Sequence, residues 1–249
     1  MYKNRVIPVL LNDGFGLVKT INFKNPTYIG DPLNAIRIFN QKYVDEIILL
    51  DISKSIAGLE PNFELAQRVA SECFMPFAYG GGISTLDHAS RLFQIGIEKL
   101  VIQKAFFISP NLVSSIANMA GSQSVCVSVD VVESKDGYRV FHTNGSVEVK
   151  RNLAVVLKQI QEMGAGEIML TNISREGKYT GLDQTLIEIA NDAVTIPIII
   201  NGGAKSYRDL LDAFPKGADA AAAGSLFVFY GNKKGVLLNY PTEIIEKEY

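Results

Sequence analysis

The sequence has little of what marks a secreted, membrane-bound or nucleic-acid-binding protein. Its 249 residues include neither a signal peptide nor an apolar run long enough to cross a membrane. A formal net charge of −2, without any basic run, offers no electrostatic footprint for nucleic acid. We therefore expect a soluble, cytoplasmic protein that has no nucleic-acid or membrane partner.

Cysteine and linker sequence are also scarce. Cys73 and Cys126 are single residues in apolar surroundings, without CxxC or metal-ligand spacing, and are predicted to be buried thiols in a reducing compartment. We predict neither a metal site nor a cofactor. Linkers rich in Pro or Ser and low-complexity segments are absent, and 47% of the residues are hydrophobic. Residues 1–249 are thus predicted to form one domain with an ample core.

An apolar run that ends in glycine occurs twice, at Phe77–Gly82 and at Ile199–Ala204. Each is followed by a polar residue that can open a helix. Such a run can cradle a phosphate, because glycine exposes backbone N–H groups beside a helix start. The second run is completed by Ala221–Leu226, where Ser225 adds a hydroxyl donor, whereas the first is followed by Val101–Ala105.

The two runs keep a constant spacing along the chain. Gly203 follows Gly82 by 121 residues (203 − 82), and Ser225 follows Lys104 by 121 residues (225 − 104). Regular spacing of this kind is typical of an internal repeat. It predicts two similar half-structures.

Short apolar runs rich in β-formers alternate with helical patterns along the chain. Strands are predicted at Val6–Leu11, Glu46–Asp51, Pro76–Tyr79, Lys99–Ile102, Ser124–Asp130, Glu167–Thr171, Pro197–Asn201 and Ala218–Ala223. Helices are predicted at Pro32–Gln41, Asn62–Cys73, Thr85–Gln94, Pro110–Met119, Leu153–Met163, Gln184–Asn191 and Ser206–Phe214. This order predicts an α/β fold with a parallel sheet closed into a (β/α)8 TIM barrel. A doubly wound open sheet is the alternative, but the equal halves favour closure.

In such a barrel the chemistry lies at the carboxyl ends of the strands. The residues predicted there are Leu11, Asp51, Gly81, Gly82, Gln103, Lys104, Asp130, Thr171, Asn172, Gly202, Gly203, Gly224 and Ser225. Asp51 and Asp130 are the acids, and Lys104 and Lys19 are candidate cations. An aspartate that closes an apolar strand can also be only the N-cap of the next turn. Both interpretations stay open for the two acids.

Several motifs follow one another in the order of a known family. They are Arg5–Leu10, Lys19 with Asn22-Phe23, Gly30–Pro32, Asp45-Glu46 before Leu49–Ile52, Gly80–Ile83, Val129-Asp130, Arg175 with Gly177 and Gly181, and Asn201–Ala204. Together they resemble HisF, the cyclase and synthase subunit of imidazole glycerol phosphate synthase, over residues 3–229 or so. The resemblance implies a barrel that takes ammonia from a HisH-like glutaminase docked beneath it.

In HisF a ring of four charged residues gates the entry of ammonia. The resemblance assigns this gate to Arg5, Glu46, Lys99 and Glu167, each at the start of a predicted inner strand. Two cations and two anions can neutralise each other where water is excluded. The alternative is that these charges only stabilise the floor of the barrel.

The family uses two aspartates, at the ends of the first and fifth strands, as general acid and base. Asp130 matches the second, but Leu11 stands at the place of the first. Leucine transfers no proton, and loss of such assistance lowers a rate by about 10²–10⁴-fold. A shift of one residue turns a strand side chain to the other face, so Asp13 could substitute only if the strand end bulges.

HisF holds a substrate with a phosphate at each end in two cradles. The second cradle is kept, as Gly177, Gly203, Gly224 and Ser225. At the first, near Gly82, the pair Gln103-Lys104 replaces small polar residues, although Lys104 can still neutralise a phosphate as a point charge. Asp130 and Lys19 are predicted to be catalytic, Asp130 because it matches one aspartate of the family's pair. Asp51, Thr171 and Gly202 are predicted to make further substrate contacts from their places at the strand ends.

The departures resemble a HisF-like branch that accompanies surface-polysaccharide genes. The motifs shared with it are Arg5–Leu11, Gly16–Thr20, Tyr28–Pro32 and Val236–Pro241. This resemblance implies conversion of an acetamido to an acetamidino group on a phosphorylated or nucleotide-linked sugar, with a third, amidotransferase-like enzyme. The alternatives are imidazole glycerol phosphate synthase activity in histidine biosynthesis, against which Leu11 argues, and a non-catalytic ammonia conduit, against which Asp130 and Lys19 argue.

Overall fold

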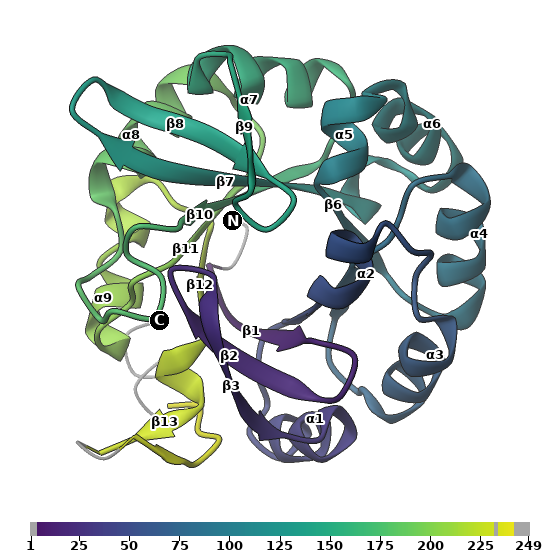
Figure 1. Cartoon of the computed structure of the whole chain (residues 1–249), viewed down its shortest axis with the longest axis vertical. Coiled ribbons are helices and arrows are strands. Elements are labelled where there is room, and N and C mark those ends of the chain that lie inside the picture. Colours follow the sequence, from purple (N-terminus) through teal and green to yellow (C-terminus); the bar gives the residue numbers. More distant parts are fainter. Residues whose placement is uncertain (1–3, 232–233, 242–249) are drawn as a thin grey trace.

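The computed structural model describes residues 4–231 and 234–241, and these residues build a closed barrel of parallel strands (Figure 1). The barrel strands are β1 (Arg5–Asn12), β4 (Ile47–Asp51), β5 (Phe77–Gly80), β6 (Lys99–Ile102), β7 (Val125–Ser134), β10 (Glu167–Asn172), β11 (Ile198–Asn201) and β12 (Ala220–Ala223). Strand β1 pairs with both β12 and β4, and β7 pairs with β10, so the barrel sheet closes on itself. The predicted (β/α)8 barrel is confirmed, and the open-sheet alternative is wrong.

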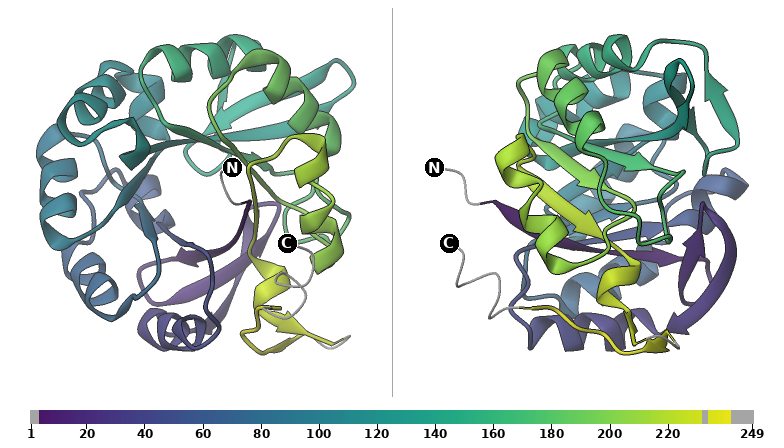
Figure 2. Two further views of the ribbon diagram at one scale, coloured as in Figure 1. Left: turned by 180° about the vertical axis from the view of Figure 1, so that it is seen from behind. Right: turned by 90° about the vertical axis from the view of Figure 1, so that its left-hand side faces the viewer.

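Most helices form a ring outside the barrel (Figures 1 and 2), and they are α1 (Pro32–Asn40), α3 (Phe63–Glu72), α4 (Leu86–Ile95), α6 (Asn111–Ala120), α7 (Leu153–Glu162), α8 (Gln184–Ala193) and α9 (Tyr207–Leu211). The short helices α2 (Ile52–Ala57) and α5 (Lys104–Ile108) follow β4 and β6 at the mouth of the barrel, and α2 lies inside the ring (Figure 1). Several helices begin at a side chain that accepts a backbone N–H, such as Asp31, Asn62 and Asp183, which is the usual N-cap. None of the helices in the described ranges is long and apolar enough to span a membrane.

Three parts of the predicted element order need correction. The helix predicted at Ser206–Phe214 is split into α9 and a 3-10 turn, η2 (Phe214–Lys216). The short helices α2 and α5 were not predicted from the sequence. Three antiparallel hairpins were not predicted either. They are β2 (Leu17–Ile21) with β3 (Lys24–Gly30), β8 (Gly137–His142) with β9 (Val147–Val149), and the small pair β13 (Phe229–Tyr230) with β14 (Gly235–Val236). The first two hairpins lie at the same end of the barrel (Figure 2).

The constant spacing of 121 residues recurs in the elements themselves. Adding 121 to the bounds of β5 and β6 gives the bounds of β11 and β12. The same addition takes α4 to α9 with η2, and the start of α5 to the start of η3 (Ser225–Phe227). The two half-structures predicted from the sequence are therefore present, and they differ mainly in how much helix follows each strand.

Inside the barrel, alternate residues of the strands face the axis. Ile7, Ile48, Cys126 and Met169 belong to an interior cluster, while the residues between them pack outward against the helices in a separate core. This is the two-residue period of a strand whose two faces are both buried. Cys126 is buried as predicted, but Cys73 is only partly buried, because it follows α3 near the surface.

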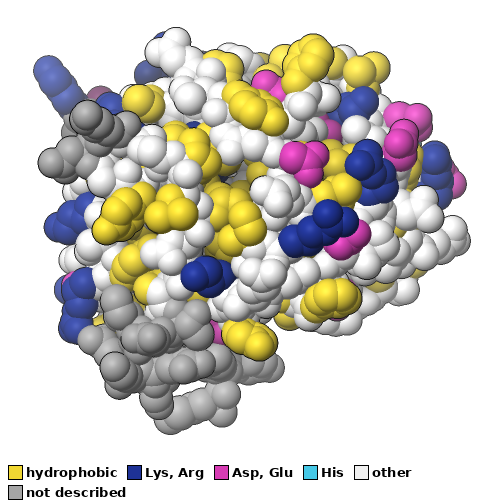
Figure 3. Space-filling model, turned by 90° about the horizontal axis from the view of Figure 1, so that it is seen from below, with side chains coloured by type: hydrophobic (Ala, Val, Ile, Leu, Met, Phe, Trp, Pro, Cys, Tyr) yellow, Lys and Arg dark blue, Asp and Glu magenta, His cyan; other side chains and the backbone are white. Residues whose placement is uncertain are grey.

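The outer wall is mixed in character. Figure 3 views the side on which α1 lies and shows hydrophobic side chains gathered near its middle, with lysines and arginines around them. Tyr28 of β3 is 62% exposed and Tyr43, which follows α1, is 83% exposed. Exposed apolar side chains are usual on protein surfaces, so this wall alone indicates no site.

Glycine at position 177 is required by a close approach as well as by its backbone angle. A Cβ there would lie 2.4 Å from the carbonyl oxygen of Thr20, at a φ of +73°. Gly137 has a φ of +109° but nothing within 4 Å. We expect Gly137→Ala to lower the free energy of unfolding by about 1–2 kcal/mol through φ alone, and Gly177→Ala to lower it more. Equal losses in urea denaturation would show that the contact with Thr20 is unimportant.

Candidate functional site

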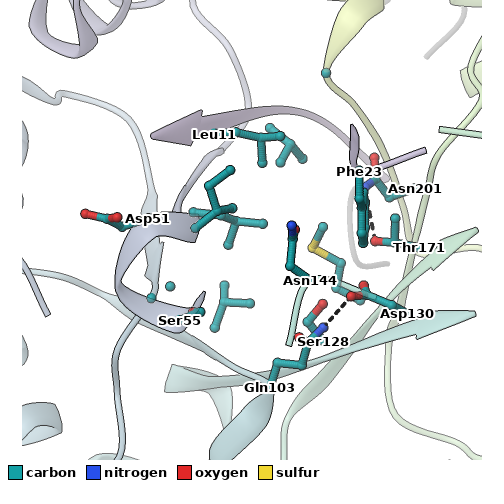
Figure 4. A pocket seen from close by; sticks show the side chains of 18 of the residues that line it. Leu11, Phe23, Asp51, Ser55, Gln103, Ser128, Asp130, Asn144, Thr171 and Asn201 are labelled. Carbon is teal, nitrogen blue, oxygen red and sulfur yellow. Dashed lines mark hydrogen bonds between the residues drawn. The ribbon is translucent and has the colours of Figure 1, made fainter. Parts of the chain in front are cut away.

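A cavity of about 260 Å³ opens at the carboxyl ends of the barrel strands (Figure 4). The residues assigned from the sequence to catalysis or substrate binding all line it, and they are Lys19, Asp51, Gly82, Gln103, Lys104, Asp130, Thr171, Gly177, Gly202, Gly203, Gly224 and Ser225. The four predicted gate residues do not; they lie at or just before the strand starts, at the opposite end of the barrel. The fold thus separates two groups of polar residues along one axis.

Asp130 lies on β7 and is only 4% exposed. Its Oδ2 atom accepts a hydrogen bond of 2.8 Å from Nε2 of Gln103. Burial raises the pKa of Asp130 to about 7, although the hydrogen bond from Gln103 acts in the opposite direction. Because β7 continues to Ser134, Asp130 is not a helix N-cap. A carboxyl group with a pKa near neutrality can both take up and release a proton at physiological pH.

Leu11 projects from β1 into the same cavity (Figure 4). Strand β1 pairs with β4 in continuous register through Leu11 and Asn12, so the strand end does not bulge there. Asn12 instead donates a hydrogen bond of 3.2 Å to Asp51. The carboxylate of Asp13 accepts hydrogen bonds from the backbone of Phe15 and Gly16 in the following turn. Neither residue lines the cavity, so Asp13 does not take the place that Leu11 leaves.

Lys19, on β2, and Glu176 form a second ionisable group in the cavity wall. Nζ of Lys19 donates to the carbonyl oxygen of Val9 at 2.5 Å, and burial lowers the pKa of Lys19 to about 8 against the opposing effect of Glu176. Burial also raises the pKa of Glu176. Glu176 was not predicted as a site residue; its place between Arg175 and Gly177, in a motif already noted, was the available signal.

Asp51 has the capping role that the sequence left open. Its carboxylate accepts hydrogen bonds from Ser53 Oγ at 2.6 Å and from the backbone N–H of Lys54 at 3.4 Å, at the start of α2. Figure 4 shows this carboxylate pointing away from the middle of the cavity. Contact between Asp51 and a substrate therefore remains a prediction, and the structure assigns the carboxylate to local structure.

The first glycine cradle is packed against protein and bordered by cations. At Gly82 a Cβ would lie 2.5 Å from the carbonyl oxygen of Leu59, so glycine lets two loops touch. Lys54 of α2 and Lys104 of α5 line the cavity on this side, and within residues 4–231 and 234–241 neither makes an ion pair with a protein carboxylate. Lys54 was not predicted as a site residue.

The second cradle is built from backbone. Gly203 accepts a hydrogen bond of 2.8 Å from the backbone N–H of Gly181, and a Cβ at Gly203 would clash with the same loop. A Cβ on Gly224 would lie 2.2 Å from Nζ of Lys19, which places this ammonium beside the cradle. The predicted helix start at Ser225 needs correction: η3 is a three-residue 3-10 turn. Backbone donors and Lys19, not a helix dipole, would attract an anion here.

Further polar side chains complete the wall. Asn201 Nδ2 donates to Thr171 Oγ1 at 3.1 Å, and Ser128 and Asn144 also line the cavity (Figure 4). Ser128 and Asn144 were not predicted, although the Asn144-Gly145 pair is a turn signal in the sequence. In the part of the chain that the structure describes, no group of three or more His, Cys, Asp or Glu side chains is placed to hold a metal ion.

At the other end of the barrel, the four residues that the sequence predicts as a gate form one closed ring. Each cation bonds to both carboxylates: Arg5 to Glu46 and Glu167, and Lys99 to the same two at 2.8 Å each. Burial alone would lower the pKa of Lys99, but the charges of Glu167 and Glu46 outweigh it and raise that pKa. The predicted ring is therefore present as a neutralised, largely buried network.

The fold and these two polar groups define a (β/α)8 barrel with a ligand cavity at one end and a charged ring at the other. A family model described as "Histidine biosynthesis protein" matches residues 5–233. Relatives include HisF proteins at 35% identity or more over more than 90% of both chains. The chain belongs to the HisF family.

The individual relatives cover nearly the whole chain. A Pseudomonas aeruginosa protein provisionally named imidazole glycerol phosphate synthase subunit hisF2 is 49% identical over 97% of each chain. A Leptospira borgpetersenii protein with a similar provisional name is 44% identical, over 97% of this chain and 96% of its own. The imidazole glycerol phosphate synthase subunit HisF of Chlorobium limicola is 37% identical over 92% of each chain.

Asp130 should make the stability of the protein depend on pH. Between about pH 4 and 7 the unfolded chain releases the proton of this residue while the folded protein keeps it, so the free energy of unfolding falls by about 1.4 kcal/mol per pH unit. Asp130→Asn removes this loss. We expect the variant to exceed the wild type by roughly 2–4 kcal/mol at pH 8 and to match it near pH 4 in urea denaturation. A difference that is constant over this range would contradict the raised pKa.

Proposed function

We propose that this chain is the synthase subunit of a glutamine-dependent complex. Ammonia enters through the ring of Arg5, Glu46, Lys99 and Glu167, follows the barrel axis and adds to an acceptor beside Asp130. The observation that supports this most strongly is the arrangement of the two polar groups, the closed ring at the starts of the strands and Asp130 near their ends.

The side chains between the ring and the cavity support the proposed path. The interior cluster includes Ala78, Cys126, Ala220 and Ala222, which are small. The same cluster also holds the bulky branched side chains that normally fill a barrel interior, among them Ile7, Ile48 and Ile199, so the small residues line only part of the axis. A neutral molecule as small as ammonia needs only a narrow passage, and small apolar side chains offer it no competing partner. The ring is closed in this structure, so passage requires one of its ion pairs to part.

The surface around the ring suits a protein partner, which we propose to be a HisH-like glutaminase. Tyr43 and Phe74 precede β4 and β5 and are 83% and 86% exposed. A hollow next to the ring is lined by Glu46, Phe77, Glu98, Lys99 and Gln123, among others. Aromatic residues are enriched at protein interfaces. A glutaminase seated here would release ammonia directly beneath the ring.

Two molecules are candidates for the acceptor to which the ammonia is added. The names of the relatives favour imidazole glycerol phosphate synthase activity. Leu11 favours another acceptor, because it leaves Asp130 without the second carboxylate that this reaction uses. We therefore propose an acetamido group of a phosphorylated or nucleotide-linked sugar, activated by a third, amidotransferase-like enzyme, with histidine-pathway cyclisation as the second candidate.

Residues of this chain supply a chemical group for each step of the proposed reaction. Asp130, with its pKa near 7, would take a proton from the attacking nitrogen and return it to the departing oxygen. Lys19 and the backbone of Gly203 and Gly224 would hold a phosphate, while Lys54 and Lys104 would neutralise an anionic group at the other side. A conduit without catalysis would need none of these.

Cyclase activity provides the first test. We expect the purified chain with an ammonium salt to turn over the histidine-pathway ribulotide about 10²–10⁴-fold more slowly than an ordinary HisF, because Leu11 cannot transfer a proton. Leu11→Asp should restore only part of the rate, since Gln103 and Lys104 still alter the first cradle. Product can be followed by absorbance. Wild-type turnover at the rate of an ordinary HisF would make histidine biosynthesis the function.

The ring can be tested in the complex with a HisH-like glutaminase. Lys99→Met leaves Glu46 and Glu167 with Arg5 alone, so we expect more glutamine to be hydrolysed per molecule of product. Removing one partner of a buried ion pair also costs about 3–5 kcal/mol of stability, so denaturation is measured in parallel. Arg37→Met, which breaks the exposed Arg37–Glu72 pair, is the matched control. A wild-type ratio of glutamine to product in Lys99→Met would return the ring to a purely structural role.

A further inference from the structure

Gln103 connects two parts of the cavity wall that are distant in sequence. Its Nε2 atom donates to Asp130 at 2.8 Å, and its Oε1 atom accepts the backbone N–H of Thr143 at 3.1 Å. Gln103 occupies the N-cap position of α5, yet its side chain makes no capping hydrogen bond. Both ends of the amide are thus used to join Asp130, in the middle of β7, to the β8–β9 turn.

The turn that Gln103 holds has an unusual backbone. Thr143, Asn144 and Gly145 have φ values of 53°, 56° and 74°, in the left-handed region that non-glycine residues rarely adopt. A Cβ on Gly145 would lie 3.0 Å from Ile173 and 3.4 Å from Phe23, so the turn is packed against its neighbours. Sparsely populated backbone angles persist only where the surroundings fix them, and they concentrate at functional sites.

The turn places one polar side chain in the cavity. Asn144 lines the cavity and points toward its middle, on the same side as Gln103 and Asp130 (Figure 4). Its amide offers a donor and an acceptor that suit an uncharged polar group of a ligand. The position of this amide relative to Asp130 depends on the chain of contacts through Gln103.

We propose that Gln103 is a positioning residue, which fixes the carboxylate of Asp130 and the turn that presents Asn144 in one geometry. The importance of this geometry for proton transfer rests on the proposed function of Asp130. The two hydrogen bonds themselves do not, and they can be measured in the purified chain without substrate or partner.

The test is NMR spectroscopy of the purified protein, labelled with ¹³C at the aspartate carboxyl carbons and with ¹⁵N in the backbone. Gln103→Met keeps the length of the side chain and removes both hydrogen bonds. We expect the pKa of Asp130 to rise by about one unit, since a donor to the carboxylate is lost, and the Thr143 N–H to exchange with solvent at least about tenfold faster. The other ionisable groups that line the cavity are unchanged by the substitution, and they are Lys19, Asp51, Lys54, Lys104, Glu176 and Tyr179.

A second variant separates the two ends of the amide. Gln103→Glu keeps an acceptor for the Thr143 N–H, removes the donor to Asp130 and adds a like charge beside it. We expect the pKa of Asp130 to rise further than in Gln103→Met, with the Thr143 N–H still protected from exchange. If Gln103 had a purely structural role, Gln103→Glu would change the pKa of Asp130 and the exchange rate of the Thr143 N–H together, or would change neither.

Two controls define the outcome. Asn144→Gly tolerates the left-handed turn and leaves both bonds of Gln103 in place, so the titration of Asp130 should match the wild type. Gln94→Leu changes an exposed glutamine on α4 and should alter neither readout. If Asp130 titrates in Gln103→Met as in the wild type, or the Thr143 N–H exchanges at the same rate, the positioning role is wrong. If both NMR readouts change in Gln103→Met as expected but ammonia-dependent product formation does not fall, the positioning role stands and the proposed function of Asp130 is wrong.

Discussion

The closed parallel barrel allows only alternate residues of each strand to face the axis, and the rest of the molecule depends on this constraint. Along β1 the inward positions are Arg5, Ile7, Val9 and Leu11. One strand therefore contributes a charge to the floor, two apolar side chains to the interior and one residue to the cavity. Because Arg5 and Leu11 lie at opposite ends of the strand, the residue at position 11 can differ without disturbing the ring. The fold can thus keep the charged ring while the residues at the cavity end change.

The two polar groups solve the problem of buried charge in opposite ways. In the ring every charge meets two of opposite sign, and the two carboxylates raise the pKa of Lys99 and of Arg5 although burial alone would lower both. Among the residues that the structure describes, the carboxylate of Asp130 has only the neutral amide of Gln103 as its hydrogen-bonded partner, and burial raises the pKa of Asp130 toward neutrality. An unpaired carboxyl costs stability that a paired one would not. This loss of stability accompanies a carboxyl group that can exchange a proton near neutral pH. It distinguishes a candidate catalytic residue from a charged residue that only stabilises the fold.

The parts of this structure that could be predicted from sequence are those governed by local periodicity. Eight buried strands show as apolar runs, and their ends locate the cavity. Asp51 and Asp130 give the same signal, an acid near the end of such a run, yet β4 ends at Asp51 while β7 continues to Ser134. Only the length of the strand decides between cap and site, and the polar pair Glu133 and Ser134 that follows Val131 and Val132 conceals that length in the sequence. Lys54, Asn144 and Glu176 come from loops and a short helix that tertiary packing places over the cavity. The turn signal at Asn144 and the motif around Glu176 mark these segments, but no local pattern shows that they reach the cavity.

The repeat of 121 residues shows where the two halves have diverged. Gly82 corresponds to Gly203, and Lys104 corresponds to Ser225. In the second half, glycine and serine offer backbone and hydroxyl donors at fixed positions, which suits the defined geometry of a phosphate. In the first half, Lys54 and Lys104 offer charge on long, flexible side chains, which attracts an anion without fixing its shape. A ligand held in this way would be anchored at one end and free to vary at the other. That difference leaves the half-barrel containing Gln103 less restrictive toward the shape of a ligand than the half-barrel containing Gly203 and Ser225.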